Sequence, residues 1–231
     1  RSLRAADRSR FVRLGRELAR VAFEHAGRSL SENALRAAAK TLALPGPEEL
    51  LARIGSAEIS AHHVLGVLYP ELADHQDDVD AAHPVAGLEA DQEFTRGSCC
   101  LPLPGERIIG IIHRGQGVVI HAIDCDQLIE FENQPQRWVD LQWREGRHPP
   151  VYNIWLSVTI RHDAGVLGKL CSLIGKQGAN ISDLVFADRK PDFYRLHIEV
   201  ELRDAEHLHA LLTSVEVESD VAEVTRMRGE Q

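Results

Sequence analysis

No stretch of this 231-residue sequence approaches the ~18 consecutive apolar residues that a membrane-spanning helix requires. Hydrophobic residues make up 44% of the chain and charged residues 26%, as in globular proteins, so we expect no membrane partner. Methionine is almost absent. Met227 is the only one, and the chain starts at Arg1 without the charged and apolar segments of a secretory signal. These absences predict a cytoplasmic protein and a piece cut from a longer chain.

Motifs of catalytic sites are also missing. The sequence contains no Gly-x-Ser-x-Gly, no His-Glu-x-x-His and no pair of carboxylates framed by glycines. The glycines at positions 115 and 117 lack the third glycine of a dinucleotide-binding loop, and residues 175–178 lack the spacing of a Walker loop. We therefore expect neither a catalytic residue nor a catalytic cofactor in this chain.

Charged residues are strongly segregated along the chain. The formal net charge of −9 argues against a surface that binds nucleic acid over its whole area. Residues 1–28 nevertheless contain eight arginines and three acids, whereas residues 71–93 contain eight acids and neither lysine nor arginine. The basic segment is either a phosphate-binding surface or a solvated helix face. The acidic stretch has few large apolar residues, which predicts a linker over residues 72–93.

The chain length suggests two or three small units, and the apolar periodicity divides the sequence accordingly. Residues 1–71 are predicted to form a helical domain. Its helices are expected before Gly27, over residues 33–42, over residues 48–54, and from a cap at Ser60 to Pro70.

Residues 94–147 are predicted to form a small domain that contains both strands and a helix. The expected elements are a hairpin of strands at 107–112 and 117–121, a short helix at 125–132 and a strand at 137–143.

Residues 151–231 have the clearest pattern. Apolar and polar residues alternate from Ile154 to Arg161, and apolar residues then follow helical spacing over 166–174. The remaining elements are predicted as strands at 181–187 and 194–202, a helix at 205–212 and a strand at 221–227. The order βαββαβ predicts a ferredoxin-like sandwich, with two helices on one face of an antiparallel sheet. The fold class is therefore α+β, in several domains.

Three cysteines and one histidine of the middle segment have the character of metal ligands. Thiolate and imidazole are the ligands that zinc prefers, and His121 and Cys125 are four residues apart where a strand meets a helix. With the adjacent pair Cys99 and Cys100 they would fill all four positions around an ion and leave none for a catalytic water, which indicates a structural site. The alternative is a set of reduced core cysteines. A disulfide is disfavoured, and Cys171 falls on the apolar side of a helix, where we expect it to pack.

These residues also carry a resemblance to a known family. The run from Cys99 to Glu106, CCLPLPGE, is followed by Ile109-Gly110, by Gly115 to Val118 and by the His-x-x-x-Cys pair. In this order and spacing the sequence resembles the zinc-finger, or conserved-cysteine, domain of long RelA/SpoT-type enzymes, although Glu106 stands where that family more often has Asp. Residues 15–18 and 58–72 are similar to the helical domain of the family, and the βαββαβ unit resembles its terminal ACT domain.

The resemblance implies a regulatory fragment of a bifunctional enzyme that makes and hydrolyses the alarmone (p)ppGpp in the stringent response. The family carries its hydrolase and synthetase domains ahead of this region, so we expect this fragment to have no activity of its own. It also implies a homodimer that forms through the ACT domain, communication with the catalytic domains of the same chain, and contact with ribosome and tRNA in the full-length protein.

ACT domains often bind amino acids, and two turns of the sequence offer suitable groups. Asp163 is expected to cap a helix, and Gly165 would let backbone amides approach a carboxylate. Asn180 offers further donors and an acceptor. The candidate ligand-binding residues are Asp163, Ala164, Gly165, Val166, Leu167, Gly178, Asn180 and Ile181. Their aliphatic members favour a branched-chain amino acid, valine, isoleucine or leucine, as the partner.

Both turns have an alternative interpretation. An aspartate at a helix start is more often a cap than a ligand contact, and Gly178 to Asn180 would end a helix whatever the function. A different function is also open, in which the chain is a module that docks on ribosome or tRNA through its basic first helix and binds no small molecule. Phosphate contacts of this kind weaken steeply with salt, whereas amino-acid binding does not depend on them.

Overall fold

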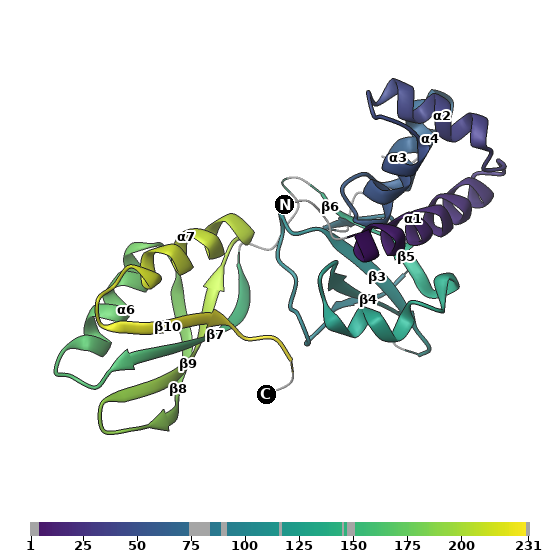
Figure 1. The fold of residues 1–231 in the computed structure, drawn as a ribbon. Helices are drawn as coiled ribbons and strands as arrows, with labels where there is room; N and C mark the ends of the chain where they lie inside the picture. Colours follow the sequence, from purple (N-terminus) through teal and green to yellow (C-terminus); the bar gives the residue numbers. More distant parts are fainter. Residues whose placement is uncertain are drawn as a thin grey trace. The chain divides into compact units, whose positions relative to one another are not determined.

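The computed structural model describes residues 5–73, 84–88, 92–115, 117–144, 146 and 151–229. The chain begins with helices and continues with two parts that contain sheets, which confirms the α+β class (Figure 1). The residue contacts form two compact units, one of Arg1–Gly97 with Arg107–Arg147 and the other of Ser98–Glu106 with His148–Gln231. Among the described helices, none combines the length and apolarity needed to span a membrane.

The first part of the first unit is helical, as predicted. Its elements are α1 (Ala5–His25), α2 (Glu32–Thr41), α3 (Pro47–Gly55), α4 (Ala61–Leu68) and α5 (Pro70–Ala73).

Local signals explain where these helices begin and end. The Ser31 hydroxyl accepts from the Ala34 N–H at the start of α2, and Ser60 does the same for the His62 N–H at the start of α4. Pro47 is the first residue of α3. An N–H at this position would have no acceptor within the helix, so proline costs no hydrogen bond there. The Ser60 cap is therefore confirmed.

Helices α1 and α3 cross where each carries a glycine. A Cβ atom added to Gly15 would lie 2.8 Å from the Gly55 nitrogen, and one added to Gly55 would lie 2.9 Å from the Gly15 nitrogen. Both distances are too short for real Cβ contacts, so the two backbones approach as closely as they do because neither residue has a side chain.

The second part of the first unit is a four-stranded sheet in the order β2-β4-β3-β5, with an added two-stranded ladder of β1 and β6. The strands are β1 (Val85–Ala86), β2 (Phe94–Arg96), β3 (Ile108–His113), β4 (Gly117–Ala122), β5 (Trp138–Asp140) and β6 (Gln142–Trp143). The predicted hairpin is present, since β3 and β4 pair in antiparallel register.

Three predictions in this region are corrected by the structure. The predicted helix over 125–132 is a 3-10 helix, η1 (Asp126–Phe131), and is followed by a second one, η2 (Pro135–Arg137). The predicted strand over 137–143 is two strands, β5 and β6. They are separated by Leu141, whose side chain is buried in the core with 1% exposure. The predicted linker over 72–93 does not hold for Val85 and Leu88, which are buried in the same cluster as Ile108 and Val118. The other parts of that segment, 74–83 and 89–91, lie outside the described residues.

The C-terminal domain has the predicted order βαββαβ. Its elements are β7 (Tyr152–Arg161), α6 (Val166–Lys176), β8 (Asn180–Arg189), β9 (Phe193–Leu202), α7 (Ala205–Glu216) and β10 (Val221–Arg226). The sheet is antiparallel in the order β10-β7-β9-β8, and both helices cover the same face (Figure 1).

The alternation that predicted β7 corresponds to burial in the sheet. Ile154, Leu156, Val158 and Ile160 are at most 2% exposed and face the helices. The residues between them are only half-buried, on the polar face of the sheet. The sandwich is therefore confirmed, with one face of the sheet packed on α6 and α7 and the other facing away from these two helices.

Candidate metal centre and ligand sites

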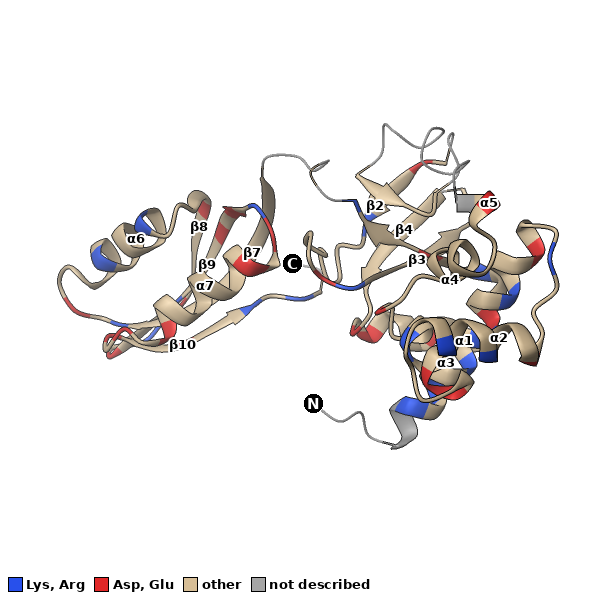
Figure 2. Ribbon diagram, turned by 90° about the horizontal axis from the view of Figure 1, so that it is seen from above, with Lys and Arg blue, Asp and Glu red and all other residues tan. Residues whose placement is uncertain are grey.

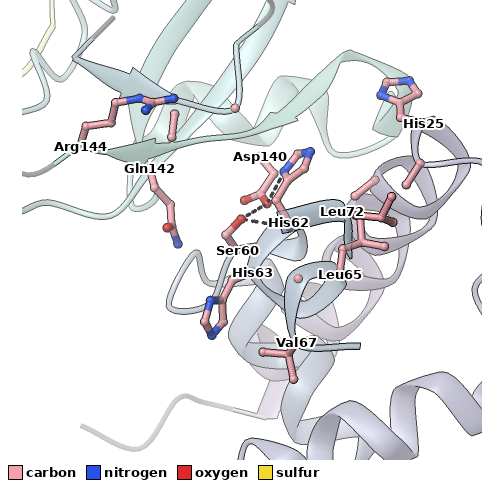
Figure 3. A pocket seen from close by; sticks show the side chains of 15 residues that line it. His25, Ser60, His62, His63, Leu65, Val67, Leu72, Asp140, Gln142 and Arg144 are labelled. Carbon is pink, nitrogen blue, oxygen red and sulfur yellow. Dashed lines mark hydrogen bonds and ion pairs between the residues drawn. The ribbon is translucent and has the colours of Figure 1, made fainter. Parts of the chain in front are cut away.

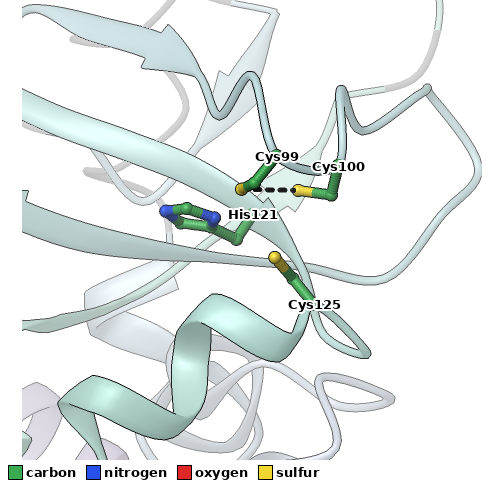
Figure 4. A group of neighbouring side chains, drawn as sticks. All are labelled: Cys99, Cys100, His121 and Cys125. Atoms are coloured by element: carbon green, nitrogen blue, oxygen red, sulfur yellow. Dashed lines mark hydrogen bonds between the residues drawn. The ribbon is translucent and has the colours of Figure 1, made fainter. Parts of the chain in front are cut away.

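Two of the predicted metal ligands come from the end of strand β4. His121 is the penultimate residue of β4 and is opposite Ile109 in the β3 ladder. Cys125 precedes η1, and its N–H donates to the Ala122 carbonyl at 2.9 Å, which closes a tight turn after the strand. The turn is what returns the Cys125 side chain toward His121 (Figure 4).

The other two ligands follow strand β2, which runs parallel to β4. The pairing of Arg96 with Ile120 and the hydrogen bond from the Gly97 N–H to the Ile120 carbonyl, at 2.8 Å, lead the chain past the end of β4. Cys99 and Cys100 come two and three residues later. A parallel strand pair thus brings residues more than twenty positions apart to one place.

The four ligand atoms of Cys99, Cys100, His121 and Cys125 all lie within 4.8 Å of one another, and the last three residues are buried. The Sγ atoms of Cys99 and Cys100 are 3.8 Å apart, far beyond a disulfide bond of about 2.05 Å. Two sulfurs at the usual ~2.3 Å from a tetrahedral zinc ion would be about 3.8 Å apart. The cluster can therefore hold a metal ion, and its donor set and sulfur spacing fit zinc.

The protonation state of His121 suits this role. Burial, together with the smaller effect of the neighbouring His113, lowers the pKa of His121 to about 4. The imidazole is therefore neutral near pH 7, with a lone pair for a metal ion and no proton to displace.

The predicted amino-acid turn lies between β7 and α6, with one difference from the prediction. Asp163 does not cap the helix with its side chain. The capping residue is Gly165, with φ +85°, and no side chain caps α6. The Asp163 carbonyl instead accepts from the Val166 N–H at 3.3 Å, while its carboxylate lies 3.9 Å from Arg161 Nε. Glycine is needed here for its left-handed backbone.

The eight predicted ligand-binding residues form two groups at opposite ends of α6. Residues 163–167 precede and begin this helix, whereas Gly178, Asn180 and Ile181 follow it. Eleven helical residues span about 16 Å, more than the length of one amino acid. In this structure the Asn180 side chain donates to Glu201 at 3.2 Å. Within one copy of the chain, the two groups do not form a single small pocket.

A pocket of about 660 Å³ in the first unit was not predicted from the sequence. Its lining includes Ser60, His62, His63 and Asp140, and Figure 3 shows Asp140 pointing to the start of α4. The buried Asp140 Oδ2 accepts from the Ser60 hydroxyl at 2.8 Å and from the Ala61 N–H at 2.6 Å, and it lies 3.6 Å from His62 Nδ1. This carboxylate therefore fastens the first turn of α4 to strand β5.

We expect Asp140→Ala to weaken the attachment of α4 to the sheet by about 2–4 kcal/mol, because it leaves the Ala61 N–H and the Ser60 hydroxyl buried without an acceptor. Hydrogen exchange of the α4 amides measures the effect. Asp188→Ala, which removes a more exposed carboxylate from β8, is the control and should leave those amides unchanged. Equal exchange rates in the parent and in Asp140→Ala would show that the carboxylate does not hold the helix.

Most arginines of the basic first helix are already paired with acids. Arg8 binds Glu48 and Glu49 of α3, and Arg10 binds Glu132 at 2.6 Å. Arg16 and Arg20 pair with glutamates of α2 and of α1 itself. Figure 2 shows blue Lys and Arg segments and red Asp and Glu segments together on the neighbouring helices α1 and α3. The phosphate-binding interpretation of this helix is correspondingly weakened.

Comparisons with known proteins follow the same division of the chain. Family models match as the RelA/SpoT AH domain over residues 2–69, the RelA/SpoT RIS domain over residues 83–144 and the ACT domain over residues 149–226. The start of the RIS match at residue 83 agrees with the burial of Val85 and Leu88.

Curated relatives match nearly the whole chain. The GTP pyrophosphokinase rsh of Brucella abortus is 25% identical over 99% of this chain and 37% of its own length. The GTP pyrophosphokinases of Photobacterium angustum and Escherichia coli K12 are 27% and 24% identical over 98% of this chain and about a third of theirs. The chain thus spans little more than a third of the length of these relatives.

A solved ACT domain, from the GTP pyrophosphokinase of Chlorobium tepidum, superimposes with a TM-score of 0.30 and 16% identity over 33% of this chain and 99% of its own. The family models give three domains in succession, and the curated relatives align with nearly the whole chain. The chain belongs to the RelA/SpoT family and corresponds to its C-terminal regulatory region, with AH, RIS and ACT domains in that order.

Proposed function

We propose that the chain is a ligand-sensing regulatory region in which a structural zinc ion shapes the RIS domain and the ACT domain binds branched-chain amino acids. Zinc would be held by Cys99, Cys100, His121 and Cys125, and would supply a fixed tetrahedral crosslink rather than a Lewis acid, because protein groups fill all four positions. The single observation that supports the metal is the convergence of four soft ligands, three of them buried.

The proposal for amino-acid binding rests on the start of α6. Helix starts leave N–H groups without intrahelical acceptors, and a carboxylate is the group that they bind best. No side chain caps α6, and a Cβ atom added to Gly165 would meet nothing within 4 Å, so the turn is open to a ligand. Val166 and Leu167 follow directly and supply an aliphatic wall, which favours valine, isoleucine or leucine over charged amino acids.

A homodimer of the ACT domain would complete this site. Residues 178–181 are a helix length away from the Asp163 turn of the same copy, so they reach a shared ligand only from a second copy. Asn180 and Ile181 begin strand β8, which lies at the edge of the sheet and pairs only with β9 among the described strands. An amino acid bound between two copies would favour one arrangement of the pair, and so shift the equilibrium of connected domains.

In the whole protein, the domains that receive this shift would be the (p)ppGpp hydrolase and synthetase domains of a cytoplasmic enzyme. Docking on ribosome or tRNA is the alternative function. The ion pairs of Arg8, Arg10, Arg16 and Arg20 do not favour α1 as the docking surface.

Isothermal titration of the chain with valine, isoleucine and leucine tests amino-acid sensing, with lysine as the charged comparison. We expect heat with the branched-chain amino acids, and at least tenfold weaker binding after Asp163→Ala, because the variant removes the acceptor beside the bound α-amino group. Glu206→Ala is the matched control, since it removes an exposed carboxylate from the start of the other helix, α7. No heat with any of the three amino acids, or an unchanged affinity in Asp163→Ala, would contradict the proposed site.

A further inference from the structure

The segment Ser98–Glu106, which carries two of the candidate metal ligands, is hydrogen-bonded to the ACT domain. The Cys99 carbonyl accepts from the Gly229 N–H at 2.8 Å, just beyond strand β10. The Pro104 carbonyl accepts from the Ala205 N–H at 2.9 Å, at the start of α7. Gly229 and Ala205 thus hold the segment near its two ends by its backbone.

One side chain holds the middle of the segment. Arg226, the last residue of β10, donates from Nη2 to the carbonyls of Cys100 at 2.9 Å and Leu101 at 2.7 Å. Its Nη1 lies 2.6 Å from Glu106 Oε1, and its side chain is only 8% exposed. Glu106 Oε2 also accepts from the Leu103 N–H at 2.6 Å. The guanidinium therefore contacts the turn at the second cysteine and at two residues that follow it.

This contact fixes a backbone conformation that the turn would not keep alone. Leu101 has φ +44°, in the left-handed region that residues with a side chain rarely adopt. A planar guanidinium can donate to two adjacent carbonyls and a carboxylate at once, which an ammonium group does not match. The direction of the Cys99 and Cys100 side chains follows from the backbone that Arg226 holds.

We infer that Arg226 is a positioning residue for the two cysteine ligands, so that the metal affinity of the RIS domain depends on the last strand of the ACT domain. The inference rests on the proposed metal site. Linkage makes the dependence reciprocal: an ion that binds the oriented cysteines more tightly also stabilises the Arg226 contact and the ACT strand that makes it. The two regulatory domains would thus be coupled through one turn of backbone.

The test is the zinc affinity of the whole 231-residue chain, measured by competition with a chromophoric chelator. We expect Arg226→Lys to weaken zinc binding at least tenfold, because lysine keeps the charge but loses the fork of donors. Saturating cobalt should still give the spectrum of a three-thiolate site, since no ligand has been removed. Arg195→Lys, the same change at an exposed position of β9, is the control and should bind zinc within twofold of the parent.

Glu106→Gln provides a second variant, because it removes the carboxylate that anchors Arg226 without changing the arginine. It should also weaken zinc binding. If Arg226→Lys does not fold, Glu106→Gln alone tests the inference. Zinc should also raise the unfolding temperature of the ACT domain less in Arg226→Lys than in the parent. Zinc binding within twofold of the parent in the folded variants would overturn the inference and leave the metal site standing. A parent chain that binds no zinc would instead refute the metal site itself.

Discussion

Cys125→Ser is expected to abolish binding of the proposed zinc ion and to give the largest fall in stability of any cysteine substitution in this chain. Cys125 is 6% exposed and lies in the turn that follows β4, so its thiolate would join that turn to the cysteines of the 98–106 segment. Structural zinc sites bind with about 10–16 kcal/mol in small peptides. A free metal concentration of 1,000 times the dissociation constant stabilises the folded state by about 4 kcal/mol.

Three measurements check this prediction: the zinc content of the purified parent and variant, and their unfolding temperatures with and without a chelator. We expect one zinc per parent chain, none in the variant, and a chelator effect in the parent alone. Cys171→Ser is the matched control, because Cys171 is half-buried in α6 and does not belong to the cluster.

The result also separates zinc ligation from the alternative of reduced core cysteines. A core cysteine loses packing when it becomes serine, which costs stability whether or not a chelator is present. If the chelator does not change the unfolding temperature of the parent, and Cys125→Ser and Cys171→Ser lose similar amounts of stability, the core interpretation is favoured and zinc binding is contradicted.

The sequence was informative wherever a local pattern determines the structure. Alternation from Ile154 to Arg161 predicted β7 because one face of that strand packs on helices, and the Ser60 cap was visible because a cap is a local hydrogen bond. The four candidate metal ligands were identified by their chemistry, since few residue types bind soft ions. Their proximity, however, depends on the parallel pairing of β2 with β4, which no local sequence pattern predicts.

The errors also have physical causes. Val85 and Leu88 are two apolar residues in an acidic stretch, too few to give a periodic signal, yet they fill the core beside Ile108. Asp163 is a good capping residue by type, but Gly165 in a left-handed conformation begins the helix two residues later. Asp140 and Arg226 act on residues about 80 and 125 positions away, so only the structure could show their roles.

Gly55→Ala is predicted to destabilise the AH domain strongly, although it adds only one methyl group. The added Cβ atom would clash with the backbone oxygen of Phe11 and lie 2.7 Å from its carbonyl carbon. Both clashing groups are backbone, so no side chain can rotate away, and α1 and α3 must move apart by roughly 1 Å to restore contact distances. Leu18 and Ala19 of α1 and Leu51 and Ile54 of α3 are all at most 3% exposed, and separation of the two helices would loosen the packing of such buried residues.

Overpacking a core usually costs about 1–3 kcal/mol, and backbone clashes belong to the upper end of that range. A loss of about 3 kcal/mol speeds native-state hydrogen exchange of the α1 and α3 amides by about a hundredfold if they exchange through opening of this domain. The ACT amides serve as an internal reference in the same sample. Gly168→Ala in α6 is the matched control: its Cβ atom meets nothing within 4 Å, and alanine favours a helix over glycine by about 1 kcal/mol.

Gly15→Ala makes the same crossing clash from the other side, because its Cβ atom would lie 2.8 Å from the Gly55 nitrogen. If one separation of the helices relieves both clashes, the double variant Gly15→Ala/Gly55→Ala loses less stability than the sum of the two single losses. Strict additivity would mean that the glycines act at independent places. Exchange in Gly55→Ala as slow as in Gly168→Ala would show that the close approach of α1 and α3 does not limit the stability of this domain.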